Sequence, residues 1–196
     1  MLVLASASPR RQELLRSAGI PFVVQPTDIP EVPQDGEAPR ACAERLAREK
    51  ALAVFQQRKT DLVLGADTIV VVDELILGKP RDAADAARML GLLSGRTHQV
   101  ITGVCVVGQK AVVSGQLSVP SEGYADTRSE TTRVMMDVLT EREIRDYIAS
   151  GEPMDKAGAY AIQGIASRWI TRIEGDYSNV VGLPVSLVYR MLRERE

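Results

Sequence analysis

Two arginines and two serines near the N-terminus form a candidate phosphate site. A short apolar run ends in Ser6-Ala7-Ser8-Pro9-Arg10-Arg11, and an amphipathic pattern follows. This order predicts a strand, a tight turn and a helix whose first turn carries the arginines. Free N–H groups at a helix N-terminus, together with hydroxyl and guanidinium groups, suit a polyphosphate. The same residues also fit an N-capped helix with arginines on the surface.

Asp67 is the acidic residue with the strongest indication of chemistry. It follows Gly65-Ala66 inside an otherwise apolar, strand-forming run, residues 62–72. A carboxylate is costly to bury in such a strand unless a cation or a metal ion pairs with it. The alternative is an acidic residue in a turn at a strand end, and we expect the strand to be interrupted at residues 65–67.

Lys50 and Lys79 are candidates for binding phosphate, and Glu31 for binding a metal ion. Lys79 lies between a glycine and a proline, which can present its ammonium group to a phosphate, and Lys50 ends a charged helical face. Glu31 lies in a proline-rich loop and can pair with Asp67 around a hard divalent cation, which prefers oxygen ligands. Taken singly, each of these residues also fits a solvated surface charge.

The segment 151–164 is too rich in glycine, alanine and turn-forming residues to be generic. Its Gln163 carries an amide that both donates and accepts, as contact with the edge of a nucleobase requires. We expect the single histidine, His98, to be structural. The sequence contains no motif of a serine hydrolase, a Walker A loop, a dinucleotide site or a zinc protease.

The composition is that of an ordinary globular protein. The 196 residues are 45% hydrophobic and 26% charged, and 24 basic against 26 acidic residues give a net charge of −2. This balance argues against a nucleic-acid partner but allows a local anion site. Cys42 and Cys105 fit reduced thiols. Because no apolar run approaches the ~20 residues that span a bilayer, we expect a cytoplasmic protein without a membrane partner.

The elements that must position these residues alternate at first and then cluster as strands. We expect helices at 9–19, 41–57, 82–93, 140–150 and from 184 onward, and strands at 22–24, 62–72, 75–77, 98–107, 112–119, 131–139 and 168–173. Prolines make 26–39 a loop, and 120–129 is expected to be a polar connection. This pattern predicts one domain, residues 1–196, with a mixed, twisted α/β sheet, a second lobe and no separating linker.

Seven short segments in this order carry a resemblance to a known family. They are residues 6–11, 46–51, 65–68, 78–80, 93–98, 155–160 and 181–184. Together they resemble the Maf family of nucleoside triphosphate pyrophosphatases nearly end to end. The resemblance implies a fold like that of inosine triphosphate pyrophosphatases, with two lobes around a central cleft. It also implies hydrolysis between the α and β phosphates, which releases a monophosphate and pyrophosphate.

The resemblance assigns roles to the candidate residues. It implies that Asp67 is the catalytic base, and charge placement suggests that Asp67 and Glu31 hold a divalent cation, Mg²⁺ or Mn²⁺. The positions that it ties to substrate choice are Arg10, Thr68 and Gln163. The polar positions that it ties to the phosphate and metal site are Ser6, Arg11, Glu31, Lys50 and Lys79.

The sequence DKAGAYAIQG, residues 155–164, resembles the branch that acts on dTTP and UTP. We therefore expect these triphosphates as substrates, with cleansing of the nucleotide pool as the role. The alternatives are a 7-methyl-GTP pyrophosphatase of the same family and a non-catalytic, nucleotide-binding regulator of cell division. The resemblance leaves a homodimer open. Residues 108–130 depart from the family pattern because they are longer and more polar than expected.

Overall fold

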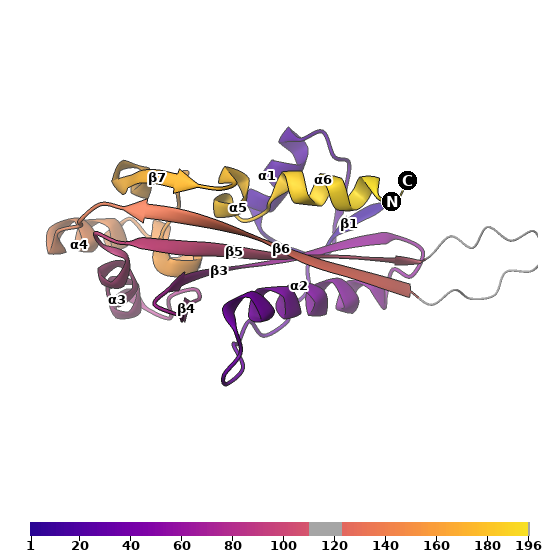
Figure 1. Ribbon diagram of the computed structural model, residues 1–196, viewed down its shortest axis with the longest axis horizontal. Coiled ribbons are helices and arrows are strands. Elements are labelled where there is room, and N and C mark those ends of the chain that lie inside the picture. The colour runs from indigo at the N-terminus through magenta and orange to yellow at the C-terminus, as the bar shows by residue number, and fades with distance from the viewer. Residues whose placement is uncertain (110–122, 196) are drawn as a thin grey trace, which may run out of the picture.

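A mixed sheet forms the centre of the computed structural model, which describes residues 1–109 and 123–195. In these residues the sheet has seven strands in the order β2-β1-β3-β5-β6-β7, and β4 pairs with β3 (Figure 1). The strands are β1 (Leu2–Leu4), β2 (Val23–Val24), β3 (Leu62–Val72), β4 (Leu75–Leu77), β5 (Thr97–Gln109), β6 (Gly123–Met136) and β7 (Ile170–Glu174). β1 is parallel to β2 and β3, and the other pairs are antiparallel. The expected strand at 112–119 lies outside the described residues.

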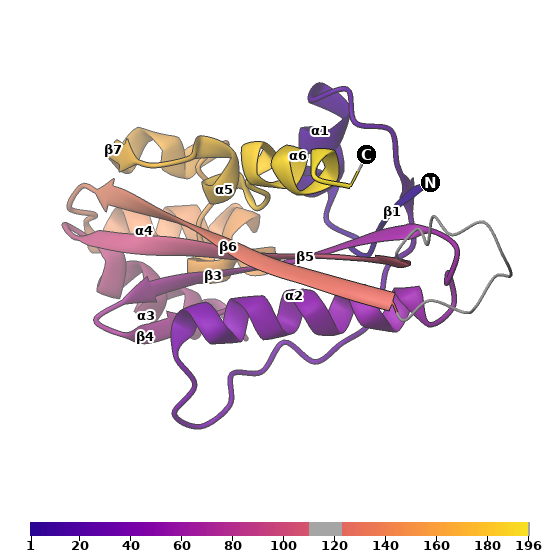
Figure 2. The same cartoon turned by 45° about the vertical axis from the view of Figure 1, so that its right-hand side comes forward.

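Helices cover both faces of this sheet. They are α1 (Pro9–Ser17), α2 (Pro39–Phe55), α3 (Ala83–Leu93), α4 (Glu141–Ala149), α5 (Tyr177–Val181) and α6 (Val185–Arg193). Figure 2 shows α2 along one face, and α1, α5 and α6 over the other. Helix α3 packs with α4 at the end where β4 pairs with β3. None of the helices in the described ranges has both the length and the apolar character that crossing a membrane requires.

Side-chain caps fix the starts of four helices, α1, α3, α4 and α5. The Ser8 side chain accepts the Arg11 N–H at 3.5 Å at the start of α1, and Asp82 caps α3. Thr140 and Glu143 form a complete capping box at the start of α4, as the sequence predicts. Because Ser8 ends the turn after β1, the cap sets the direction in which the first turn of α1 leaves the sheet.

Helix α2 lies unusually close to the sheet because two glycines face it. A Cβ on Gly65 of β3 would lie 2.3 Å from the Ala47 carbonyl oxygen, and one on Gly103 of β5 would lie 2.2 Å from that of Ala43. Neither strand therefore has room for a side chain at these positions. The helix residues that the sequence places inward are all buried or partly buried by this packing: Leu46, Ala47, Ala51 and Val54.

Some expected boundaries are wrong. Strand β3 runs without a break through residues 65–67, because each residue pairs with β5 and the glycine serves helix packing rather than a turn. Strand β6 already begins at Gly123, so most of the expected connection 120–129 is strand; its polar side chains lie on a half-exposed sheet surface, which tolerates them. Helix α2 both starts and ends two residues earlier than expected. The sequence does not predict the short helix α5, which Asp176 caps.

A gap along one edge of β3 creates the site. β1 pairs with residues 62–64 of β3, and β4 pairs with residues 70–72. Between these pairings, residues 65–69 have no neighbouring strand on that edge among the described residues. Successive side chains of a strand point to opposite faces, so groups from both faces can reach the opening.

Candidate active site

A cavity of about 940 Å³ opens at the gap beside β3. Its lining draws on the turn before α1, the loop before α2, the middle of β3, the segment after β4 and the segment 155–163. All nine residues that the sequence indicates as site residues line it: Ser6, Arg10, Arg11, Glu31, Lys50, Asp67, Thr68, Lys79 and Gln163.

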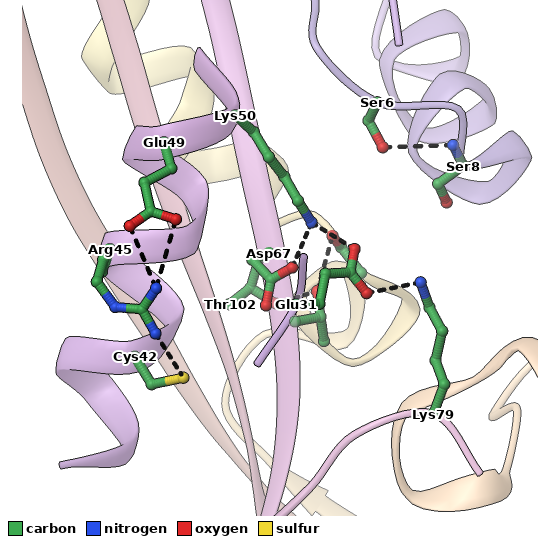
Figure 3. A network of polar contacts seen from close by, with 12 residues as sticks. Ser6, Ser8, Glu31, Cys42, Arg45, Glu49, Lys50, Asp67, Lys79 and Thr102 are labelled. Atoms are coloured by element: carbon green, nitrogen blue, oxygen red, sulfur yellow. Dashed lines mark hydrogen bonds and ion pairs between the residues drawn. The ribbon is translucent and has the colours of Figure 1, made fainter. Parts of the chain in front are cut away.

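Lys50 joins the two candidate carboxylates (Figure 3). From α2, its ammonium donates to Oδ1 of Asp67 at 2.5 Å and to Oε1 of Glu31 at 2.6 Å. Lys79 donates to the other oxygen of Glu31, Oε2, at 2.7 Å. The side chains of Lys50 and Asp67 are each only 6% exposed, so their charges meet away from bulk water.

The two carboxylates differ in proton affinity. Burial raises the pKa of Asp67, although the positive charges of Lys50 and Arg11 oppose this shift. Burial also acts to raise the pKa of Glu31, but Lys50 and Lys79 outweigh it and lower that pKa to about 2. Glu31 therefore stays ionised at physiological pH, and Asp67 is the better proton acceptor of the two.

Arg11 is fixed by three acceptors of the protein itself. Its Nε donates to the Gly182 carbonyl at 2.8 Å, Nη1 to the Ser6 hydroxyl at 3.0 Å and Nη2 to the Thr68 hydroxyl at 3.0 Å. Burial lowers its pKa, and the negative charges of Asp67 and Glu31 work against that shift. The structure thus holds a positive charge at one position in the wall of the cleft.

Thr68 follows Asp67 in β3, so the two side chains lie on opposite faces of the sheet and both border the cleft. Its hydroxyl lies 3.0 Å from the hydroxyl of Thr102 on β5 and donates to the Gly182 carbonyl at 3.2 Å. Thr102 in turn donates to the carbonyl of Asn179 in α5 at 3.3 Å. Asp67 and Thr68 can therefore serve one ligand only because the edge of β3 is open between them.

Arg10 and Gln163 complete the walls of the cleft. Nη1 of Arg10 donates to Oδ2 of Asp155 at 3.3 Å. Asp155 ends the short 3₁₀ helix η1 (Glu152–Asp155) and also receives Lys156 Nζ at 2.5 Å. Arg10 thus connects the start of α1 to the segment that carries Gln163.

Several contributors are not among the residues that the sequence indicates. Asp155 lies in a segment that the sequence singles out, but only the fold shows that it faces Arg10. The Gly182 carbonyl accepts from both Arg11 and Thr68, and no pattern marks a backbone oxygen. Asn179 is buried outside the cavity lining, but its carbonyl accepts the Thr102 hydroxyl and its amide donates to the Val100 carbonyl at 3.0 Å. The contribution of these groups depends on where the fold places them, and residue types and spacing do not predict that placement.

The oxygen atoms of Glu31 and Asp67 suit a hard divalent cation. Mg²⁺ is commonly bound by one or two carboxylates together with substrate phosphates. Here two carboxylates converge on one cation, the Lys50 ammonium. Among the described residues no three histidine, cysteine or acidic side chains gather as a metal site. Two carboxylates of this kind fit a cation whose remaining coordination positions would be filled by substrate phosphate and water.

Two curated proteins match this chain over nearly its whole length. A dTTP/UTP pyrophosphatase of Koribacter versatilis is 55% identical over 192 residues, which are 98% of this chain and 93% of that protein. A dTTP/UTP pyrophosphatase of Syntrophomonas wolfei is 50% identical over 192 residues, 98% of this chain and 96% of that protein.

A solved structure shares the fold. The Ham1 protein of Staphylococcus aureus aligns with a TM-score of 0.50 at 13% identity, covering 100% of this chain and 99% of that one. This likeness concerns the fold alone, and the expected mixed α/β sheet is confirmed. The family model described as Maf-like protein matches residues 1–195. With this match and relatives at 50–55% identity over nearly the whole chain, the protein belongs to the Maf family.

Proposed function

We propose that this protein hydrolyses dTTP and UTP to the nucleoside monophosphate and pyrophosphate. The observation that carries the proposal is the buried Asp67, whose pKa is raised and which Lys50 holds inside a cleft lined with cations. The names of the relatives at 50–55% identity support the same reaction and the same substrates.

The cations bind the triphosphate and stabilise the charge that develops on it. Arg11 is held in a fixed orientation for this role, and Lys79 lines the same cavity. Charge on the departing pyrophosphate grows in the transition state, so preorganised cations lower the barrier more than they strengthen substrate binding. The Ser6 hydroxyl supports Arg11 from within the turn.

Asp67 accepts a proton from the attacking water. Its raised pKa makes it a stronger base than an exposed aspartate, and Lys50 fixes Oδ1 so that the carboxylate keeps one orientation. Glu31 stays ionised and, with Asp67, would hold Mg²⁺ or Mn²⁺. When bound, such a cation would offset phosphate charge and supply the Lewis acidity that lowers the pKa of water.

Gln163 and Thr68 are proposed to select the base. Uracil and thymine offer carbonyl oxygens and one N–H on their pairing edge, and the Gln163 amide can both donate and accept. The Thr68 hydroxyl lines the same cavity, where contacts with Arg11 and Thr102 hold it. Gln163 is exposed and Thr68 is partly buried, so a bound base would remove water from both groups. A base that covers them and leaves them unpaired is disfavoured.

Pyrophosphate release from a panel of triphosphates tests the proposal. We expect turnover of dTTP and UTP with Mg²⁺ or Mn²⁺, weaker turnover of CTP and of 7-methyl-GTP, and loss of activity in excess chelator. A preference for 7-methyl-GTP would contradict the pyrimidine assignment. Tight binding of UTP without pyrophosphate release would contradict the catalytic one.

A further inference from the structure

An ion pair between Arg10 and Asp155 links the two walls of the cleft. Arg10 belongs to the first turn of α1, and Asp155 follows 145 residues later at the end of η1, with Nη1 and Oδ2 3.3 Å apart. Both residues line the cavity. Their side chains are 30% and 66% exposed, and exposed pairs contribute little to stability. The pair therefore matters because it fixes the position of the Arg10 guanidinium.

Asp155 is itself held in place. It accepts from Lys156 Nζ at 2.5 Å, and the same ammonium donates to the Glu152 carbonyl at 2.8 Å. The Glu152 carboxylate receives the Tyr147 hydroxyl at 2.8 Å and the Ile165 N–H at 3.0 Å. The turn that carries Asp155 is thus braced at both ends, so its carboxylate is a fixed acceptor for Arg10.

The two adjacent arginines use their donors differently. Arg11 directs Nε, Nη1 and Nη2 to acceptors of the protein. Arg10 directs Nη1 to Asp155. A guanidinium has five N–H groups, so Arg10 keeps donors for a ligand even while the pair is formed. All three nitrogens of Arg11 are engaged by the protein, so its orientation is fixed. Within the described residues only Nη1 of Arg10 is engaged, so Arg10 can direct its Nε and Nη2 donors to a ligand.

We propose that Asp155 is a positioning residue for base selection, which orients Arg10 so that its remaining N–H groups meet a carbonyl oxygen of a pyrimidine-2,4-dione. This inference rests on the proposed function and adds the residue that sets the direction of Arg10. Uracil and thymine present an oxygen at position 4, whereas cytosine presents an amino group there. An N–H group of Arg10 that faces this amino group has no acceptor there. Arg10 held in this orientation therefore disfavours CTP.

The variant Asp155→Asn tests the inference, because it keeps the shape of the side chain and removes its charge. We expect kcat/KM for UTP to fall about tenfold while that for CTP changes little, as for the loss of one charge-assisted hydrogen bond. Arg10→Ala should lower the UTP/CTP ratio similarly. The double variant should lower it no further, since both changes remove the same interaction.

Asp73→Asn is the matched control. Asp73 also pairs with an arginine, accepting from Arg96 Nη2 at 2.5 Å, is 72% exposed and is not part of the cavity lining. This variant should retain the wild-type ratio. Equal falls for UTP and CTP in Asp155→Asn, or additive effects of the Arg10 and Asp155 changes on the ratio, would overturn the inference.

Binding separates this inference from the proposed function. Calorimetry with α,β-methylene analogues of UTP and CTP measures base selection without turnover. If the wild type turns over neither nucleotide, the proposed function fails. The ratio of the UTP-analogue and CTP-analogue affinities would still test the role of Asp155. A ratio that Asp155→Asn leaves unchanged, or a wild type that binds both analogues equally, overturns the inference by itself.

Discussion

The ammonium of Lys50 and the carboxylate of Asp67 meet at 2.5 Å although their residues lie on different elements, α2 and β3. Both side chains are almost fully buried. The approach depends on Gly65 and Gly103, which carry no side chain at the positions where the backbone of α2 comes close to the sheet. Packing of α2 and the proton affinity of Asp67 are therefore coupled, so a change in the helix contact should also alter the chemistry of the carboxylate.

Asp67→Asn should abolish most turnover without abolishing binding. The substitution keeps the size of the side chain but removes the proton acceptor, and a positioned general base contributes about 10²–10⁴-fold to a rate. We expect kcat for UTP to fall by that order while KM changes little. Steady-state pyrophosphate release measures both parameters. Near wild-type kcat in this variant would show that another group takes the proton.

The acid limb of the pH–rate profile should lie above the pH at which an exposed aspartate titrates, about 3.9. Burial raises the pKa of Asp67 despite Lys50 and Arg11, and the ionised form is the active base, so kcat/KM falls as the pH drops through that raised value. Glu31, with a pKa of about 2, does not titrate in this range. A profile that stays flat down to pH 4 would contradict the assignment of Asp67.

His98 should make the protein less stable in mild acid. It is 2% exposed, its Nε2 lies 2.8 Å from the Tyr160 hydroxyl, and burial lowers its pKa from 6.5 to about 4. Because the folded pKa is below the unfolded one, its stabilisation is complete above pH 6.5 and is lost as the pH falls to 4.

Urea unfolding of the wild type and of His98→Gln at several pH values measures this effect. Between pH 6.5 and 4 the wild type should lose about 3 kcal/mol more unfolding free energy than the variant, which has no imidazole to protonate. The carboxylates titrate in both proteins and cancel in the comparison. Parallel stability profiles would mean that His98 is protonated as easily in the folded state as in the unfolded chain.

Gly65→Ala should damage both stability and activity. Its Cβ would lie 2.3 Å from the Ala47 carbonyl oxygen and 2.7 Å from the Ala51 nitrogen, so α2 must shift and carry Lys50 with it. Overpacking of this kind costs about 1–3 kcal/mol. We expect urea unfolding to show that loss and kcat to fall, because Lys50 no longer holds Asp67 in its orientation.

Gly91→Ala in α3 is the control for that change. A Cβ there meets no atom within 4 Å, and the position is an exposed helix interior. Alanine is favoured over glycine in a helix by roughly 0.5–1 kcal/mol, so the control should gain stability and keep full activity. If Gly65→Ala behaves like Gly91→Ala, the close contact of α2 with β3 is not what positions Lys50.

The local signals in the sequence predict most of the fold. Thr140 and Glu143 mark the start of α4 and Asp82 that of α3, because a cap is satisfied within four residues. The wrong predictions concern long-range pairing. The neighbours of Gly65 in the sequence alone predict a strand break there. The strand is nevertheless unbroken, because β5 pairs along one edge of it and α2 packs against its face.

The residue types of the site, the order of its segments and their resemblance to the Maf family follow from the amino-acid sequence alone. Chemistry-bearing residues beside turns and glycines are visible in one dimension, so the sequence is enough to single out Asp67, Lys50, Arg11 and Glu31. The partners of these residues depend on the tertiary structure. It places Lys50 between Glu31 and Asp67, and it leaves the edge of β3 open between β1 and β4. The physical reason is that desolvation and ion pairing depend on distances between elements, and a linear sequence does not contain those distances.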